Sequence, residues 1–129
     1  MSMERNIITM MKSGTVIIPK DVTCVWMSEP ELVELFGVTA PALRAAIRAV
    51  YKNGVLEEYE AQEYVRLENG YYADVFCFPM IAALAFRINT FGAEQVRNAI
   101  LERLYLRKEK TSIFFSLVGN FGKASKYQA

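Results

Sequence analysis

The chain contains no histidine among its 129 residues, and it has only two cysteines, Cys24 and Cys77. Without imidazole there is no Ser-His-Asp or Cys-His catalytic pair, and most zinc sites lose their nitrogen ligands. No motif frames the carboxylates as an acid-base pair. We therefore expect no enzymatic activity, no metal or other cofactor, no small-molecule substrate, and reduced cysteines in the core.

Long apolar runs are also missing. The most apolar stretch, 79–89, is short and carries Arg87, so it falls below the ~18 unbroken apolar residues that a membrane-spanning helix needs. The first six residues, MSMERN, lack the apolar core of a secretory signal. These absences predict a soluble, cytoplasmic protein with no membrane partner. A hydrophobic fraction of 53% with 22% charged residues predicts a globule whose apolar surplus favours self-association.

Two short helices are predicted within residues 27–52. Ser28 and Glu31 have the spacing of a capping box, which predicts a helix start, and Gly37 supplies the left-handed residue that ends such a helix. Thr39 can cap a second helix that ends near Asn53-Gly54. The apolar stripe of that helix consists of Leu43, Ala46, Ile47 and Val50. Two helices joined by a tight glycine turn predict a helix-turn-helix.

Two β-hairpins are predicted on either side of this pair. Runs 7–11 and 15–18 flank Lys12-Ser13-Gly14, and the β-prone run 22–27 follows. Runs 64–67 and 71–78 flank Glu68-Asn69-Gly70, and Asn-Gly is a strong hairpin turn. A hairpin placed after a helix-turn-helix is typical of a wing. Adjacent strand residues point to opposite faces, so we expect at most one of Tyr71 and Tyr72 to be exposed.

The second half is predicted to be mainly helical. Pro79 suits the first turn of a buried helix, 90–92 forms a break, and 93–108 forms the longest helix, with Val96, Ile100 and Leu104 facing the core. The apolar run 113–118 is predicted to be strand-like and to be covered by another part of the protein, for example a second subunit. We expect a domain over 1–110 and a C-terminal extension over 111–129.

Charge is segregated along the chain although its net value is only +1. The second predicted helix, 40–52, contains no acid and places Arg44, Arg48 and Lys52 at i, i+4 and i+8 on one face. The following stretch, 57–68, has five glutamates against Arg66 alone, and it is either a loop or a frayed helical turn where it precedes the hairpin. From residue 97 onward the balance is again basic. A phosphate backbone would therefore meet two basic regions and avoid one acidic segment.

The order of these elements, with the motifs VWMSEPELVELFGV, FRIN and VRNAILERL, resembles the N-terminal region of the RhuM-like virulence-associated proteins and related phage-type regulators. The resemblance spans residues 25–106. It implies an α+β fold, a winged helix-turn-helix with an N-terminal β-hairpin and additional C-terminal helices, in a regulator of transcription or of a mobile element. Related sequences place Ser, Thr, Arg and Asn at the front of the second helix, where this chain has Ala40, Pro41, Ala42 and Ala45.

Our first hypothesis is therefore a homodimer that binds double-stranded DNA, with the second helix in the major groove and the hairpin beside it. Alanine and proline cannot distinguish bases by bidentate hydrogen bonds, so contacts to the phosphate backbone should dominate. The candidate DNA-binding residues are Thr39, Arg44, Arg48, Lys52 and Arg66. The alternative is a module of helix-turn-helix shape that mediates protein interaction or oligomerisation without binding DNA.

Overall fold

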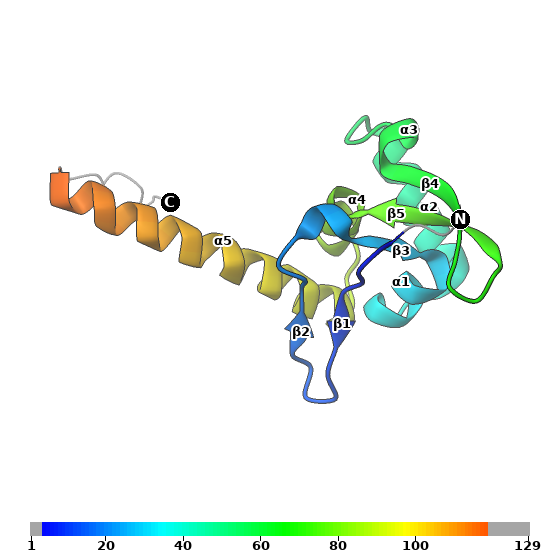
Figure 1. Ribbon diagram of the computed structural model, residues 1–129, viewed down its shortest axis with the longest axis horizontal. Helices are drawn as coiled ribbons and strands as arrows, with labels where there is room; N and C mark the ends of the chain where they lie inside the picture. Colours follow the sequence, from blue (N-terminus) through cyan, green and yellow to red (C-terminus); the bar gives the residue numbers. More distant parts are fainter. Residues whose placement is uncertain (1–3, 119–129) are drawn as a thin grey trace. The chain divides into compact units, whose positions relative to one another are not determined.

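The computed structural model describes residues 4–118, with side chains described for residues 4–105. Packing contacts divide the chain into two units, residues 1–99 and residues 100–129. The described residues form a mixed α+β fold of five α-helices and two small antiparallel sheets, and both sheets belong to the first unit (Figure 1). The α+β class expected from the sequence is confirmed.

The N-terminal hairpin consists of β1 (Thr9–Met10) and β2 (Val16–Ile17), which pair antiparallel. This confirms the predicted hairpin, with shorter strands. The predicted strand over 22–27 is wrong in its first half, where a single 3-10 turn, η1 (Val22–Cys24), stands instead. Asp21 causes the difference, because its carboxylate accepts a hydrogen bond from the Thr23 backbone N–H and caps the turn. Strand β3 is confined to Trp26–Ser28.

Helices α1 (Glu29–Phe36) and α2 (Ala40–Lys52) begin and end where the sequence predicts. The Glu31 carboxylate accepts a hydrogen bond of 2.8 Å from the Ser28 N–H, as a capping box requires, and Gly37 adopts φ +67°. The Thr39 hydroxyl accepts a hydrogen bond from the Ala42 N–H and so caps α2. Both helices bury their apolar stripes, through Leu32, Leu35, Phe36, Leu43, Ile47 and Val50.

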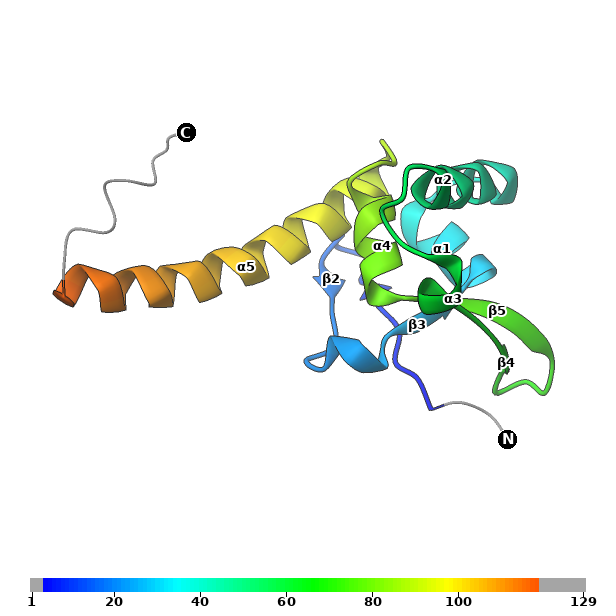
Figure 2. The same ribbon diagram turned by 90° about the horizontal axis from the view of Figure 1, so that it is seen from above.

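The larger sheet contains β3, β4 (Gln62–Arg66) and β5 (Tyr72–Cys77) in the order β3-β5-β4, and all its neighbours are antiparallel. The predicted hairpin is therefore confirmed, and Gly70 adopts φ +92° in its turn. The acidic stretch before it, which the sequence left open, forms one short helix, α3 (Glu58–Ala61). In Figure 2 the sheet lies beside the helices of the first unit, where α2 packs on both α1 and α4.

Helix α4 (Phe78–Ala85) starts with Pro79 in its first turn and is largely buried, as expected. Helix α5 (Phe91–Val118) starts earlier than predicted, because Thr90 is its cap and accepts a hydrogen bond from the Ala93 N–H. Gly92 is thus part of the helix and not of a break. It lies so close to α1 that a Cβ at this position would overlap the Leu35 carbonyl oxygen.

The far part of α5 corrects two further predictions. The backbone is helical through Val118, so the strand-like interpretation of 113–118 is wrong; a six-residue apolar run does not by its pattern distinguish a strand from a helix segment. Leu104 is 53% exposed, so the core stripe does not extend to it. The predicted extension over 111–129 lies partly outside the described residues, which end at 118. Among all the residues that the structure describes, 4–118, no helix combines the length and apolarity needed to cross a bilayer.

Candidate nucleic-acid interface

The solvent-facing side of α2 is the surface on which the sequence places its candidate DNA contacts. Arg44, Arg48 and Lys52, which we call the α2 cation row, are all exposed. They are exposed because Leu43, Ile47 and Val50 hold the opposite side of α2 in the core. Pro41, Ala42 and Ala45 are exposed in front of the row. This surface therefore presents cations and small apolar groups to solvent.

Arg44 differs from the other two members of the row because its Nη1 contacts a carboxylate oxygen of Glu29, at the start of α1, at 2.5 Å. The two side chains are 51% and 32% exposed, so solvent screens the pair and its contribution to stability is no more than about 1 kcal/mol. Arg48 and Lys52 make no ion pair with any side chain that the structure describes. The row thus has two free positive charges and one that is locally compensated.

Beside the row, a cleft of about 490 Å³ opens between α2 and the β4–β5 hairpin. Its apolar lining comes from Ile47, Ala73 and Phe76. Arg44 and Arg48 line the α2 side, whereas the carboxylates of Glu29, Glu58 and Asp74 supply negative charge. The cleft is therefore mixed in charge, and its carboxylates repel a phosphate that approaches from the hairpin side.

Tyr51 spans this cleft from α2, and its hydroxyl donates a hydrogen bond of 2.8 Å to the Gln62 side-chain carbonyl on β4. Burial raises the pKa of Tyr51 to about 12, and the negative charges of Glu58 and Asp74 act in the same direction. The hydroxyl is therefore a neutral hydrogen-bond donor that ties the helix to the hairpin.

The remaining two candidates flank the row without joining it. The Thr39 hydroxyl already caps α2, so it is positioned at the positive end of the helix. Arg66 ends β4 and is exposed beside the hairpin turn, where its guanidinium lies near Gly70. Among the described residues it does not line the cleft that α2 shares with the hairpin.

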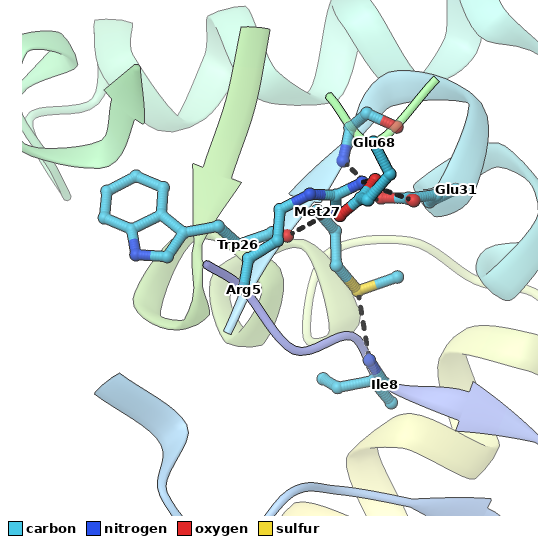
Figure 3. Close-up of polar contacts among 7 residues, drawn as sticks. Arg5, Ile8, Trp26, Met27, Glu31 and Glu68 are labelled. Atoms are coloured by element: carbon cyan, nitrogen blue, oxygen red, sulfur yellow. Dashed lines mark hydrogen bonds and ion pairs between the residues drawn. The ribbon is translucent and has the colours of Figure 1, made fainter. Parts of the chain in front are cut away.

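No motif in the sequence marks Arg5, whose side chain is only 3% exposed in the structure. Its guanidinium donates to both carboxylate oxygens of Glu31, at 2.7 and 2.9 Å, to the Trp26 carbonyl at 2.8 Å, and to Glu68 at 3.0 Å (Figure 3). Arg5 therefore joins the N-terminal segment to β3, to the cap of α1 and to the β4–β5 turn. Arg5 is far in sequence from Trp26, Glu31 and Glu68, so only the folded structure shows that it binds them.

The electrostatics of this contact favour the charged forms. Burial by itself would raise the pKa of Glu31, but the hydrogen bonds from Arg5 and from the Ser28 backbone outweigh it and hold the pKa below its ordinary value. The hydrogen bond to Glu31 likewise raises the pKa of Arg5. The capping box and the Arg5 contact thus share one carboxylate.

The outer half of the β4–β5 hairpin exposes aromatic rings. Tyr64 and Tyr72 are stacked, with ring centroids 5.6 Å apart and an angle of 19° between their planes. Tyr71 and Tyr72 are both exposed, so the expectation that one of them would be buried is wrong. Tyr71 lies before β5 begins, where strand alternation does not apply.

Comparisons with protein-family models, with curated proteins and with solved structures find no match for this chain. Within the described residues there is no group of three or more Cys, Asp or Glu side chains arranged to hold a metal ion. Cys24 and Cys77 are free but only partly buried, so the expectation that they belong to the core is wrong. Function is therefore inferred from topology, exposure and charge.

Proposed function

We propose that this chain binds double-stranded DNA as a winged helix-turn-helix protein, with α2 in the major groove and the β4–β5 hairpin as the wing. The observation that carries the proposal is the exposed, acid-free α2 cation row on the second of two helices joined by a tight glycine turn. The topology supports it, because the hairpin follows α2 and forms one sheet with β3, the strand before α1.

The contacts in this proposal are mainly electrostatic. Arg48 and Lys52 bind phosphates directly, and Arg44 does so by exchanging its Glu29 partner for a phosphate. Thr39 and Arg66 are flanking contacts to the backbone. The small apolar residues at the front of α2 reach at most a thymine methyl, so sequence discrimination is modest. A homodimer would present two such helices to one duplex, as expected of a regulator of transcription or of a mobile element.

The test is a titration of a fluorescent DNA duplex with the full chain over a range of salt concentrations. Each phosphate contact adds about 0.9 to the slope of log affinity against log salt, so the double variant Arg48→Ala/Lys52→Ala should lower that slope by about 1.8 per bound chain. The matched control Lys12→Ala/Lys20→Ala removes two exposed cations elsewhere and should leave the slope unchanged. An unchanged slope in the α2 variant removes α2 from the interface, and absence of binding at low salt removes the proposal.

The second candidate is a protein-interaction or oligomerisation module of the same shape that does not bind DNA. The pairing of Arg44 with Glu29 favours it, because it compensates one of the three cations. The exposed, stacked tyrosines of the hairpin favour it as well. Concentration-dependent solution mass without DNA binding at low salt would select this candidate.

A further inference from the structure

The segment 57–74, which comprises α3 and most of the β4–β5 hairpin, is acidic and rich in tyrosine, whereas α2 is basic. We call it the acidic tyrosine hairpin. It contains six carboxylates against one guanidinium, and its four tyrosines are each more than half exposed. The carboxylates are Glu57, Glu58, Glu60, Glu63, Glu68 and Asp74, the guanidinium is Arg66, and the tyrosines are Tyr59, Tyr64, Tyr71 and Tyr72.

The strand register places two of these tyrosines and one of the carboxylates on a single face of the hairpin. Tyr64 is paired with Asp74 and Arg66 with Tyr72, and residues paired across an antiparallel ladder share a face. The Tyr64 and Tyr72 rings stack on that face. Asp74 also lines the cleft beside α2, together with Glu58. An aromatic platform is therefore continuous with a cleft that carries carboxylates on its hairpin side.

Arg66 is the one cation that the strand register places on this face. The Arg66 guanidinium lies near Gly70, at the turn end of the hairpin. On the opposite wall of the cleft, Arg44 contacts Glu29, which compensates its charge. Arg48 remains as a positive charge on the α2 wall, so an entering cation is directed toward the hairpin wall.

Exposed aromatic rings amid carboxylates match one kind of partner. A guanidinium is planar, weakly hydrated and positively charged, so it stacks on tyrosine rings and pairs with carboxylates at once. A phosphate backbone is repelled by the same carboxylates. We propose that the acidic tyrosine hairpin is a docking surface for an arginine-rich segment of another protein. One guanidinium stacks on the Tyr64–Tyr72 pair, and a second enters the cleft beside Glu58 and Asp74.

This inference goes beyond DNA binding and does not depend on it, because Tyr64, Tyr72, Glu58 and Asp74 are not among the proposed DNA contacts, of which the hairpin contributes only Arg66. The experiment is a titration of a fluorescein-labelled hexa-arginine peptide with the full chain, compared with hexalysine and hexaglutamate peptides. We expect saturable binding of hexa-arginine, weaker binding of hexalysine, which has no planar group to stack, and no binding of hexaglutamate.

Exposed side chains can be replaced without loss of the fold, so variants are informative. Tyr64→Ala/Tyr72→Ala should lower the affinity for hexa-arginine about ten-fold, whereas Tyr64→Phe/Tyr72→Phe keeps both rings and should retain it. Asp74→Asn should weaken binding, and Glu63→Gln is its matched control, because Glu63 lies on the other face of β4. Circular dichroism verifies that each variant is folded.

Four results would overturn the proposal, of which three concern the peptide and the oligomeric state and the last concerns DNA. One is unchanged affinity for hexa-arginine in the tyrosine-to-alanine variant. Another is equal loss in the Asp74 and Glu63 variants, which would show diffuse attraction with no defined surface. The third is a concentration-dependent dimer that the tyrosine-to-alanine variant abolishes, which would make a second copy of this chain the occupant. The same variant should leave affinity for duplex DNA unchanged; a loss there would reassign the platform to nucleic acid, whereas failure of the wild-type chain to bind DNA bears only on α2.

Discussion

Replacing Arg5 by methionine removes a guanidinium that four hydrogen bonds hold, while it keeps a long apolar side chain of similar reach. The Arg5 side chain is 3% exposed, so water cannot replace it freely as a partner. Its loss leaves the Trp26 carbonyl without this donor and leaves Glu31 with its Ser28 contact alone. The N-terminal segment also loses its link to the β4–β5 turn through Glu68.

The expected cost follows from the exposure of each partner. Removing one member of a fully buried ion pair costs about 3–5 kcal/mol, but Glu31 is 28% exposed and Glu68 is 66% exposed. The exposed contact with Glu68 contributes less than about 1 kcal/mol. The Arg5 Nε is buried and has no hydrogen-bond partner in the described part of the chain, which is unfavourable in the wild-type fold. Removing this atom therefore offsets part of the free energy that the variant loses with the four hydrogen bonds. We expect Arg5→Met to lower the free energy of unfolding by about 2–3 kcal/mol.

Urea denaturation of the full chain, followed by circular dichroism, measures this change. The midpoint of thermal unfolding should fall by about 10 °C. Glu68→Gln should cost less than about 1 kcal/mol, and Lys12→Met, which removes an exposed cation from the N-terminal hairpin, should cost almost nothing. If Arg5→Met is as stable as Glu68→Gln, the contact with Glu31 and Trp26 does not hold the fold together, and the reasoning is refuted.

Three further outcomes are expected. The pKa of Glu31 is lowered in the folded chain, so its ionised form stabilises the fold above the ordinary value of 4.5; the stability gap between wild type and Glu31→Gln should narrow as acid denaturation proceeds below that pH, and a constant gap would contradict this. The pKa of Tyr51 is raised to about 12, so ultraviolet titration should show one tyrosine that ionises at higher pH than the others, and this step should be absent in Tyr51→Phe. The stabilisation that the neutral Tyr51 hydroxyl gives the fold should be lost as the pH rises from 10 toward 12. Gly92→Ala should lower the free energy of unfolding by about 3 kcal/mol, because the Leu35 carbonyl oxygen cannot move away from the added Cβ. Gly54→Ala should cost only about 1 kcal/mol, because that Cβ meets open space and only the backbone at φ +74° is strained. Equal costs of the two variants in thermal melts would show that α5 does not approach α1 closely at Gly92.

The helix pair and the hairpin could be predicted from sequence because their determinants are local. Ser28 and Glu31 are three residues apart, and the Thr39 cap reaches Ala42, also three residues on. The exposure of the α2 cation row follows from helical periodicity once the buried stripe is known. In such cases one short window of sequence contains every group that decides the structure.

Contacts between distant residues could not be predicted in this way. Arg5 meets Glu31 and Glu68 across 26 and 63 residues, and no periodic pattern links them. The compensation of Arg44 by Glu29 likewise depends on how α1 and α2 cross. The cleft beside the tyrosine platform is lined by both α2 and the hairpin strands, so it depends on how these separate elements pack together.

The two proposals make opposite demands on the carboxylates of the cleft, and one variant separates them. Glu58 and Asp74 line the cleft together with Arg48, so they lower the potential that a phosphate on α2 experiences. The double variant Glu58→Gln/Asp74→Asn should therefore raise affinity for duplex DNA about two-fold at low salt, with the gain screened away at high salt. The same variant should weaken binding of the hexa-arginine peptide, which needs these carboxylates. Paired titrations with DNA and with peptide measure both; a change in the same direction for the two ligands would show that the cleft does not discriminate by charge.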